Sequence, residues 1–159
     1  MRTLSPDNRA AALKEGSKSG EASKLLDTQS AYNSEGTELQ STLGPQHTVK
    51  LASGATVEAR DHEQYYYDEG APSEGGPYRL VTKVTEGAQY SGKEEEVRTS
   101  TTSYSGQSNL GWKLRKPTSV TTDPSGLKLT HTTLYETGTG NVIETRTPAS
   151  VKAGRELTL

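Results

Sequence analysis

The segment with the clearest chemical motif runs from Gly87 to Lys93 and matches the first seven positions of a phosphate-binding P-loop. In such loops a glycine-rich backbone cradles the phosphates, the lysine reaches their outer oxygens, and the next residue is a Ser or Thr that holds magnesium. Here the next residue is Glu94, with two further glutamates behind it. Three carboxylates repel a triphosphate, and no helical apolar pattern follows to supply a helix N-terminus. We therefore interpret this segment as the tip of a β-hairpin.

Potential metal ligands gather in residues 61–63, which read Asp-His-Glu, and again at Asp68 and Glu69. Alternate residues of a strand point to opposite faces of a sheet, so neighbours in a strand do not converge on one ion. We expect a solvated strand and loop here, with His62 paired to a carboxylate or facing solvent.

The three histidines, His47, His62 and His131, lie far apart in the chain. Ser and Asp are frequent enough that a Ser-His-Asp set can be composed in many ways, so composing one is no sign of catalysis. Trp112 could bind a sugar or stack with Arg115, but in a chain so poor in large apolar residues we expect it in the core. We expect no enzyme, no cofactor, and no catalytic, cofactor-binding or metal-binding residue.

Composition favours a β protein with a thin core. Only 29% of the 159 residues are hydrophobic, with no Phe and one Trp, against a usual ~45–50%. The formal net charge of −2 does not force the chain open, and the many Thr and Tyr residues suit a half-buried sheet surface. The interspersed charges argue against nucleic-acid binding, and no apolar run is long enough for membrane insertion. The first residues lack the apolar segment of a signal peptide.

The elements that must position these residues repeat around an anchor tyrosine. Tyr32, Tyr67, Tyr104 and Tyr135 each follow an extended run and precede a polar residue and a glycine. Their spacings of 35, 37 and 31 residues are uneven, so the repeat is degenerate. We expect the last three tyrosines at corresponding points of successive hairpins, on one face of a sheet.

Turn and capping signals divide the rest of the chain. Ser5-Pro6 predicts the start of a short helix that stops at Gly16, and a second helical turn over Glu21 to Leu26 is an alternative to an irregular arm. From Asp27 onward we expect strands and turns. The predicted turns and loops lie at Ser53-Gly54, Asp68 to Pro77, Asp123 to Gly126, and Thr139 to Asn141. Gly126 would resist substitution by Val if its φ is positive.

Two stretches, YYYDEGAP…GGPYRLVTKV and GWKLRKPTSVTTDPSGLKLT, resemble the long irregular repeats of actinobacterial RHS-repeat, or YD-repeat, proteins. The literal dipeptide is Tyr67-Asp68, and Tyr135-Glu136 with Gly140 is a conservative variant. The resemblance covers about residues 27 to 148. The family includes bacterial polymorphic toxins, cocoon-forming subunits of Tc toxin complexes, wall-associated bacterial proteins and animal teneurins.

The resemblance implies that such hairpins wind into a hollow shell around a toxin domain or another polypeptide, outside the cell or on its surface. The family's core motif and a toxin domain are absent from this sequence, so we expect an excerpt of a shell. The expected partners are the rest of that shell and its enclosed polypeptide. Glycan or cell-wall components are further candidate partners.

We therefore expect an all-β fold of antiparallel β-hairpin repeats in a curved sheet, part of an RHS/YD-repeat shell, with a short N-terminal helix. The expected divisions are an irregular or helical arm at 1–26, hairpin repeats at 27–148, and a further strand or tail at 149–159. The expected function is structural, with no chemistry at any residue. The alternative is a cell-surface β-module that binds glycan or protein through exposed Tyr and Trp; an enzyme would instead show a pocket with converging titratable groups.

Overall fold

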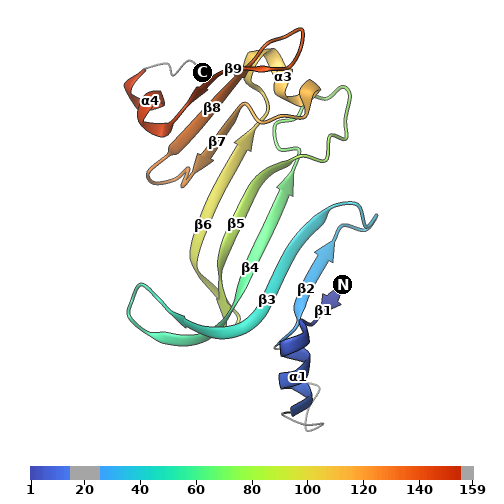
Figure 1. Cartoon of the computed structure of the whole chain (residues 1–159), viewed down its shortest axis with the longest axis vertical. Helices are drawn as coiled ribbons and strands as arrows, with labels where there is room; N and C mark the ends of the chain where they lie inside the picture. Colours follow the sequence, from blue (N-terminus) through green and yellow to red (C-terminus); the bar gives the residue numbers. More distant parts are fainter. Residues whose placement is uncertain (15–25, 155–159) are drawn as a thin grey trace. The chain divides into compact units, whose positions relative to one another are not determined.

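The computed structural model describes residues 1–14 and 26–154, and among these residues it is an open antiparallel sheet of nine strands with three short helices. The strands follow one another in the sheet in chain order, from β1 to β9 (Figure 1). The expected all-β fold with a short N-terminal helix is confirmed. The strands are β1 (Arg2–Thr3), β2 (Thr28–Tyr32), β3 (Leu39–Lys50), β4 (Thr56–Tyr67), β5 (Val81–Tyr90), β6 (Lys93–Ser103), β7 (Ser119–Thr122), β8 (Leu129–Tyr135) and β9 (Val142–Arg146); the helices are α1 (Pro6–Lys14), α3 (Gly106–Leu114) and α4 (Pro148–Ala153).

Two compact units make up the chain. Unit 1 comprises Met1–Tyr65 and Thr85–Arg98, and unit 2 comprises Tyr66–Val84 and Thr99–Leu159. In unit 1, helix α1 begins as predicted, because Pro6 is its first residue and the Ser5 hydroxyl accepts a hydrogen bond from the Asn8 amide at 3.2 Å. The predicted stop at Gly16 lies outside the described residues. Of the predicted helical turn at 21–26, only Leu26 is among the described residues.

The hairpin of β3 and β4 in unit 1 turns where the sequence predicts it. Val49 pairs with Val57, and the Leu51 amide donates to the Ala55 carbonyl at 2.8 Å across the loop that holds Ser53-Gly54. The register shifts between Leu43 and Gln46, on either side of Gly44-Pro45. Proline has no N–H for the ladder, so a bulge is the place where a strand tolerates it.

In unit 2, the strands β6 to β9 form an antiparallel ladder in which Thr102 pairs with Val120 and Val120 pairs with His131. The turn between β7 and β8 is confirmed, because the Gly126 amide donates to the Asp123 carbonyl at 3.2 Å. The residues with positive φ here are Asp123 (53°) and Lys128 (51°), and Gly126 is not one of them. Any intolerance of a side chain at Gly126 must therefore come from contacts.

Helices α3 and α4 correct the expectation of strands and turns throughout unit 2. Residues 149–153, where we expect a further strand or a tail, belong to α4, which has Thr147 as N-cap, Pro148 in its first turn and Gly154 as a left-handed C-cap. Within α3, three consecutive residues, Gln107, Ser108 and Asn109, have φ of 54°, 55° and 67°. This left-handed turn is costly for residues other than glycine, so tertiary contacts must hold it.

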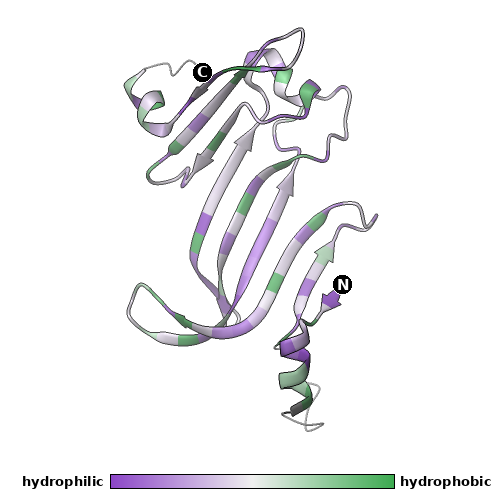
Figure 2. Cartoon of the chain, viewed as in Figure 1, coloured by the Kyte–Doolittle hydropathy of each residue, from purple (hydrophilic) through white to green (hydrophobic). Residues whose placement is uncertain are grey.

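Apolar burial is sparse in both units. Figure 2 shows hydrophobic residues as isolated bands along the strands, not as continuous runs. The buried apolar side chains among the described residues are Leu51, Ala59 and Ala88 in unit 1, and Tyr104, Leu110, Trp112 and Tyr135 in unit 2. The expectation of a thin core is confirmed.

Candidate functional site

The P-loop-like segment is a hairpin tip, as the sequence predicts. It spans the end of β5, a turn and the start of β6. Ser91 and Gly92 have φ of 47° and 72°, the left-handed backbone that a two-residue type I′ turn requires. Gly87 lies inside β5, where a Cβ atom would stand 3.1 Å from the Glu95 carbonyl oxygen. This segment therefore has the backbone of a strand pair and not that of a phosphate cradle.

The neighbouring acidic and histidine residues of β4 contact different partners and do not converge on one point. His62 Nδ1 lies 2.6 Å from Glu94 Oε1, which confirms pairing with a carboxylate. Asp61 instead lies 3.7 Å from His47 Nε2 at the surface, and His131 is exposed on β8 in unit 2. Among the described residues no group of three or more His, Cys, Asp or Glu is arranged to hold a metal ion.

The Asp68 carboxylate stabilises the Gly- and Pro-rich loop that precedes β5, because it binds the backbone at the end of that loop. Its Oδ2 accepts hydrogen bonds from the amides of Tyr78 (2.8 Å) and Arg79 (2.9 Å), and its Oδ1 accepts one from Leu80 (2.9 Å). Charge-assisted hydrogen bonds of this kind are stronger than neutral ones. The predicted loop from Asp68 to Pro77 is confirmed, and Asp68 is the residue that fixes its closing end.

Each anchor tyrosine lies at the end of a strand or directly after it, and for Tyr67, Tyr104 and Tyr135 that strand is the second of a hairpin. Tyr32, Tyr67 and Tyr135 are the last residues of β2, β4 and β8, and Tyr104 follows β6 directly. The predicted correspondence of position is confirmed, whereas a shared sheet face stays a prediction. Tyr32 is 45% exposed, while Tyr104 and Tyr135 are buried.

The two buried anchor tyrosines make the same kind of bond. The Tyr104 hydroxyl donates to the carbonyl of Val81, the first residue of β5, at 3.0 Å. The Tyr135 hydroxyl donates to the carbonyl of Pro117, just before β7, at 2.8 Å. Each phenol thus ties the end of one strand to the start of its hairpin partner. Burial raises the pKa of both tyrosines.

The residue after the tyrosine connects one strand to the next in three of the four cases. Its amide donates to the carbonyl of the residue that precedes the following strand. The pairs are Asn33 to Glu38 (2.9 Å), Asp68 to Leu80 (3.0 Å) and Glu136 to Asn141 (2.8 Å). At Tyr32, Tyr67 and Tyr135, therefore, a strand ends at the tyrosine and the amide of the next residue bonds to the start of the following strand.

Trp112 is a core residue, as expected. It is 1% exposed, and its ring centroid lies 5.0 Å from that of Tyr78 and 4.8 Å from that of Tyr104. Its indole N–H donates to the Ser105 hydroxyl at 3.1 Å. Arg115 bonds to the carbonyl of Tyr78, so the guanidinium holds the loop that carries this aromatic cluster.

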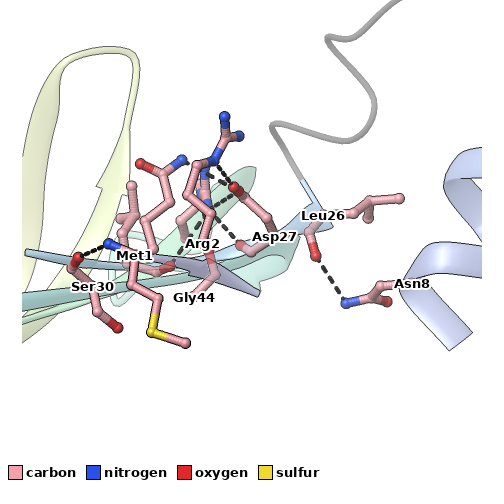
Figure 3. Close-up of polar contacts among 10 residues, drawn as sticks. Met1, Arg2, Asn8, Leu26, Asp27, Ser30 and Gly44 are labelled. Carbon is pink, nitrogen blue, oxygen red and sulfur yellow. Dashed lines mark hydrogen bonds and ion pairs between the residues drawn. The ribbon is translucent and has the colours of Figure 1, made fainter. Parts of the chain in front are cut away.

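A buried ion pair in unit 1 is not foreseen from the sequence. Asp27 is 2% exposed and contacts Arg2 (Figure 3). Arg60 Nη2 lies 2.9 Å from Asp27 Oδ1. Arg60 Nε also donates to the Gly44 carbonyl at 2.5 Å, within the β3 bulge. Burial alone would raise the pKa of Asp27, but hydrogen bonds from Arg2, Gln29 and Arg60 outweigh it and hold that pKa below its ordinary value. This cluster joins β1, β2 and the bulge.

A groove of about 390 Å³ crosses the sheet face of unit 2. Hydroxyl groups, the Gln107 amide, Leu134 and the Glu144–Arg146 ion pair line it. The Gln107 side chain is held by the Tyr135 backbone, to whose carbonyl it donates at 2.7 Å and from whose amide it accepts at 2.8 Å. These two hydrogen bonds to the end of β8 help to offset the energetic cost of the left-handed backbone at 107–109.

Comparison with known proteins finds no matching family model, no matching curated protein and no matching solved structure. Within the described parts of the chain, none of the helices has the length and apolar character needed to cross a membrane.

Proposed function

We propose that this chain is a non-catalytic structural segment of an RHS-type shell that encloses or displays another polypeptide. The observation that carries the proposal is the unit of tyrosine and polar residue, which ends one strand and bonds to the start of the next in the same way at Tyr32, Tyr67 and Tyr135. Such a unit lets a sheet grow strand by strand, and the open strand order from β1 to β9 leaves room for that growth.

The residues that could suggest chemistry are bound into the fold, which supports a structural role. Asp68 holds a loop, His62 pairs with Glu94, and Trp112 lies in the core. The alternative of a glycan-binding module needs exposed aromatic rings. Trp112, Tyr104 and Tyr135 are buried, Tyr67 is half-buried, and Tyr32 is exposed.

The test measures whether an enclosed polypeptide is protected from protease. The sample is the native polypeptide or complex that carries this segment, isolated from its host through a tag on the segment. We expect a further polypeptide in the preparation that resists protease while the sheet is intact. It should become sensitive when Tyr104→Ala and Tyr135→Ala remove both buried phenols. The matched control is Leu127→Ala, which changes a residue that is 75% exposed.

Two results would overturn the proposal. One is a preparation in which no polypeptide beyond this sheet is present, or in which digestion rates do not depend on the two tyrosines. The other is binding of the isolated chain to cell-wall glycans that disappears in Tyr32→Ala, which would establish the surface-module alternative.

A further inference from the structure

Another groove in unit 2, of about 720 Å³, lies between the start of β8 and helix α4. Its lining combines apolar residues, among them Leu129, Pro148 and Val151, with the two lysines Lys128 and Lys152. Helix α4 packs against β8 and β9, so both walls belong to the same unit (Figure 1). The volume is in the range of small-molecule sites, which are mostly apolar with a small number of polar groups.

Hydrogen bonds fix both walls of this groove. The Lys128 amide donates to the Asp123 carbonyl at 2.9 Å, which holds the chain where it enters β8. Helix α4 is capped at both ends: the Thr147 hydroxyl accepts a hydrogen bond from the Ser150 amide at 3.4 Å, and the left-handed Gly154 closes the last turn. The walls are therefore in place before a ligand arrives, as is usual for small-molecule sites.

Two exposed lysines add positive charge to the groove. Among the described residues, neither Lys128 nor Lys152 forms an ion pair. The acidic residue closest to Lys128 in the sequence, Asp123, bonds through its carboxylate to the amides of Gly126 and Leu127. An anionic group at the groove is therefore attracted by two cations that no described carboxylate contacts.

The backbone around the groove favours a hydrocarbon chain over a peptide. Strand β8 pairs with β9 from Thr132 onward, so only Leu129 to His131 have no strand beside them on that side. A peptide could form few backbone hydrogen bonds there, and its other N–H and C=O groups would lie against apolar side chains at a cost in free energy. A hydrocarbon chain has no such groups, and its burial against Pro148 and Val151 is favourable.

We propose that this groove binds a single free fatty acid. The hydrocarbon chain packs against Leu129, Pro148 and Val151, and the carboxylate lies beside Lys128 and Lys152. A membrane surface is a poorer match, because segments that recognise anionic lipid surfaces carry clusters of about four to eight basic residues. The site goes beyond the proposed function, since a structural segment neither requires it nor excludes it.

The experiment uses the full chain and sodium decanoate below its micellar concentration. Calorimetry measures binding, and nuclear magnetic resonance of the backbone amides reports where the ligand lies. We expect one saturable site, with shift changes concentrated at Leu129, Thr130 and residues 149–152. Decyltrimethylammonium has the same hydrocarbon chain and the opposite charge, so it should bind more weakly by roughly fivefold or more.

Lys152→Glu should weaken decanoate binding roughly five- to tenfold, because it reverses one of the two charges beside the carboxylate. The matched control is Lys113→Glu in the same unit. Lys113 and Lys152 are both exposed basic residues in the last turn of a short helix, so both variants lose the same favourable interaction with the helix dipole. Lys113→Glu should bind decanoate like the wild type.

Leu129→Thr tests the apolar wall and should weaken decanoate binding roughly fivefold through lost apolar contact. The matched control is Leu134→Thr, at a leucine of the same strand that does not line this groove. The two leucines are 43% and 40% exposed, so both substitutions remove a similar amount of apolar surface. Circular dichroism of all four variants verifies that the sheet is retained.

Absence of saturable decanoate binding would overturn the inference, as would equal binding by the two members of either pair of variants. Shift changes outside the groove, or tighter binding of decyltrimethylammonium than of decanoate, would overturn it as well. Binding to phosphatidylglycerol vesicles without binding to decanoate would assign the surface to a membrane instead. Because this test involves neither protease nor an enclosed polypeptide, its failure is distinct from failure of the shell proposal.

Discussion

At the residue scale, Asp123 and Gly126 show why a glycine is needed at a position where φ is ordinary. A Cβ atom on Gly126 would stand 2.4 Å from Asp123 Oδ2. That carboxylate cannot simply move away, because it accepts hydrogen bonds from the amides of Gly126 at 3.0 Å and Leu127 at 2.7 Å. The restriction at Gly126 is therefore a contact with a fixed carboxylate and not backbone strain.

Gly126→Ala should lower the free energy of unfolding by about 1–3 kcal/mol, since the carboxylate must give up hydrogen bonds. Gly138→Ala is the matched control, because no atom lies within 4 Å of its Cβ position. It should be neutral or stabilise by up to about 1 kcal/mol through the unfolded chain. Urea unfolding measures both, and in an Asp123→Ala background the cost at Gly126 should disappear. A cost that persists there would refute the contact mechanism.

Trp112 is the largest buried side chain in unit 2, so Trp112→Ala should lower the free energy of unfolding by about 3–5 kcal/mol. Leu127→Ala, at a position that is 75% exposed, should change it by no more than about 0.5 kcal/mol. Urea unfolding followed by circular dichroism distinguishes the two, because the signal does not depend on the tryptophan. Similar values for both variants would contradict a core role for Trp112.

The Asp27 cluster makes stability depend on pH. The folded-state pKa of Asp27 is below its ordinary 3.8, so its contribution is present above that value and is lost as the pH falls through the folded pKa. The difference in unfolding free energy between the wild type and Asp27→Asn should shrink as pH falls from about 5 to below 3.8. A difference that stays constant over this range would show that the carboxylate charge is not what stabilises the cluster.

At the element scale, the strained part of α3 depends on side-chain contacts made elsewhere in unit 2. Gln107 is fixed by the Tyr135 backbone and Trp112 by two tyrosine rings, while Ser108 between them is exposed with φ of 55°. The element therefore keeps an unfavourable backbone because the residues on each side of it are anchored.

Ser108→Gly should raise the free energy of unfolding by about 1 kcal/mol, because glycine adopts this left-handed backbone without steric cost. Lys113→Gly, in the right-handed last turn of the same helix, should lower it by about 0.5–1 kcal/mol. Thermal unfolding of the two variants checks the opposite signs. Destabilisation by Ser108→Gly would mean that the left-handed turn is not under strain.

Local signals account for the elements that the sequence predicts correctly. Proline and glycine mark the turn at Asp123–Gly126, and Ser5-Pro6 marks the start of α1. Thr147-Pro148 followed by Gly154 is a local signal for α4, of the same kind as Ser5-Pro6 for α1. No local signal marks the left-handed turn of α3, because distant partners hold it. The same is true of Asp27, whose partners Arg2 and Arg60 are 25 and 33 residues away.

At the scale of the whole molecule, the small set of buried apolar side chains must offset the conformational entropy of a long chain. Charge-assisted bonds such as those of Asp68 and Asp27 fix loops and strand ends, but their net contribution is modest. The surplus that keeps this chain folded is therefore small.

The isolated chain should consequently unfold at or below ~65 °C, the upper end of typical mesophile domains, and its transition should depend on protein concentration. The physical reason is the open sheet, since the free edge of β9 can pair with other chains once they are abundant. Circular dichroism melts at two concentrations, with analytical ultracentrifugation at the same concentrations, provide the measurement. In Ile143→Lys the concentration dependence should weaken while the midpoint at low concentration stays similar. A sharp, reversible and concentration-independent transition well above ~65 °C would show that the chain is a self-sufficient domain, and the interpretation of it as one segment of a larger sheet would have to be abandoned.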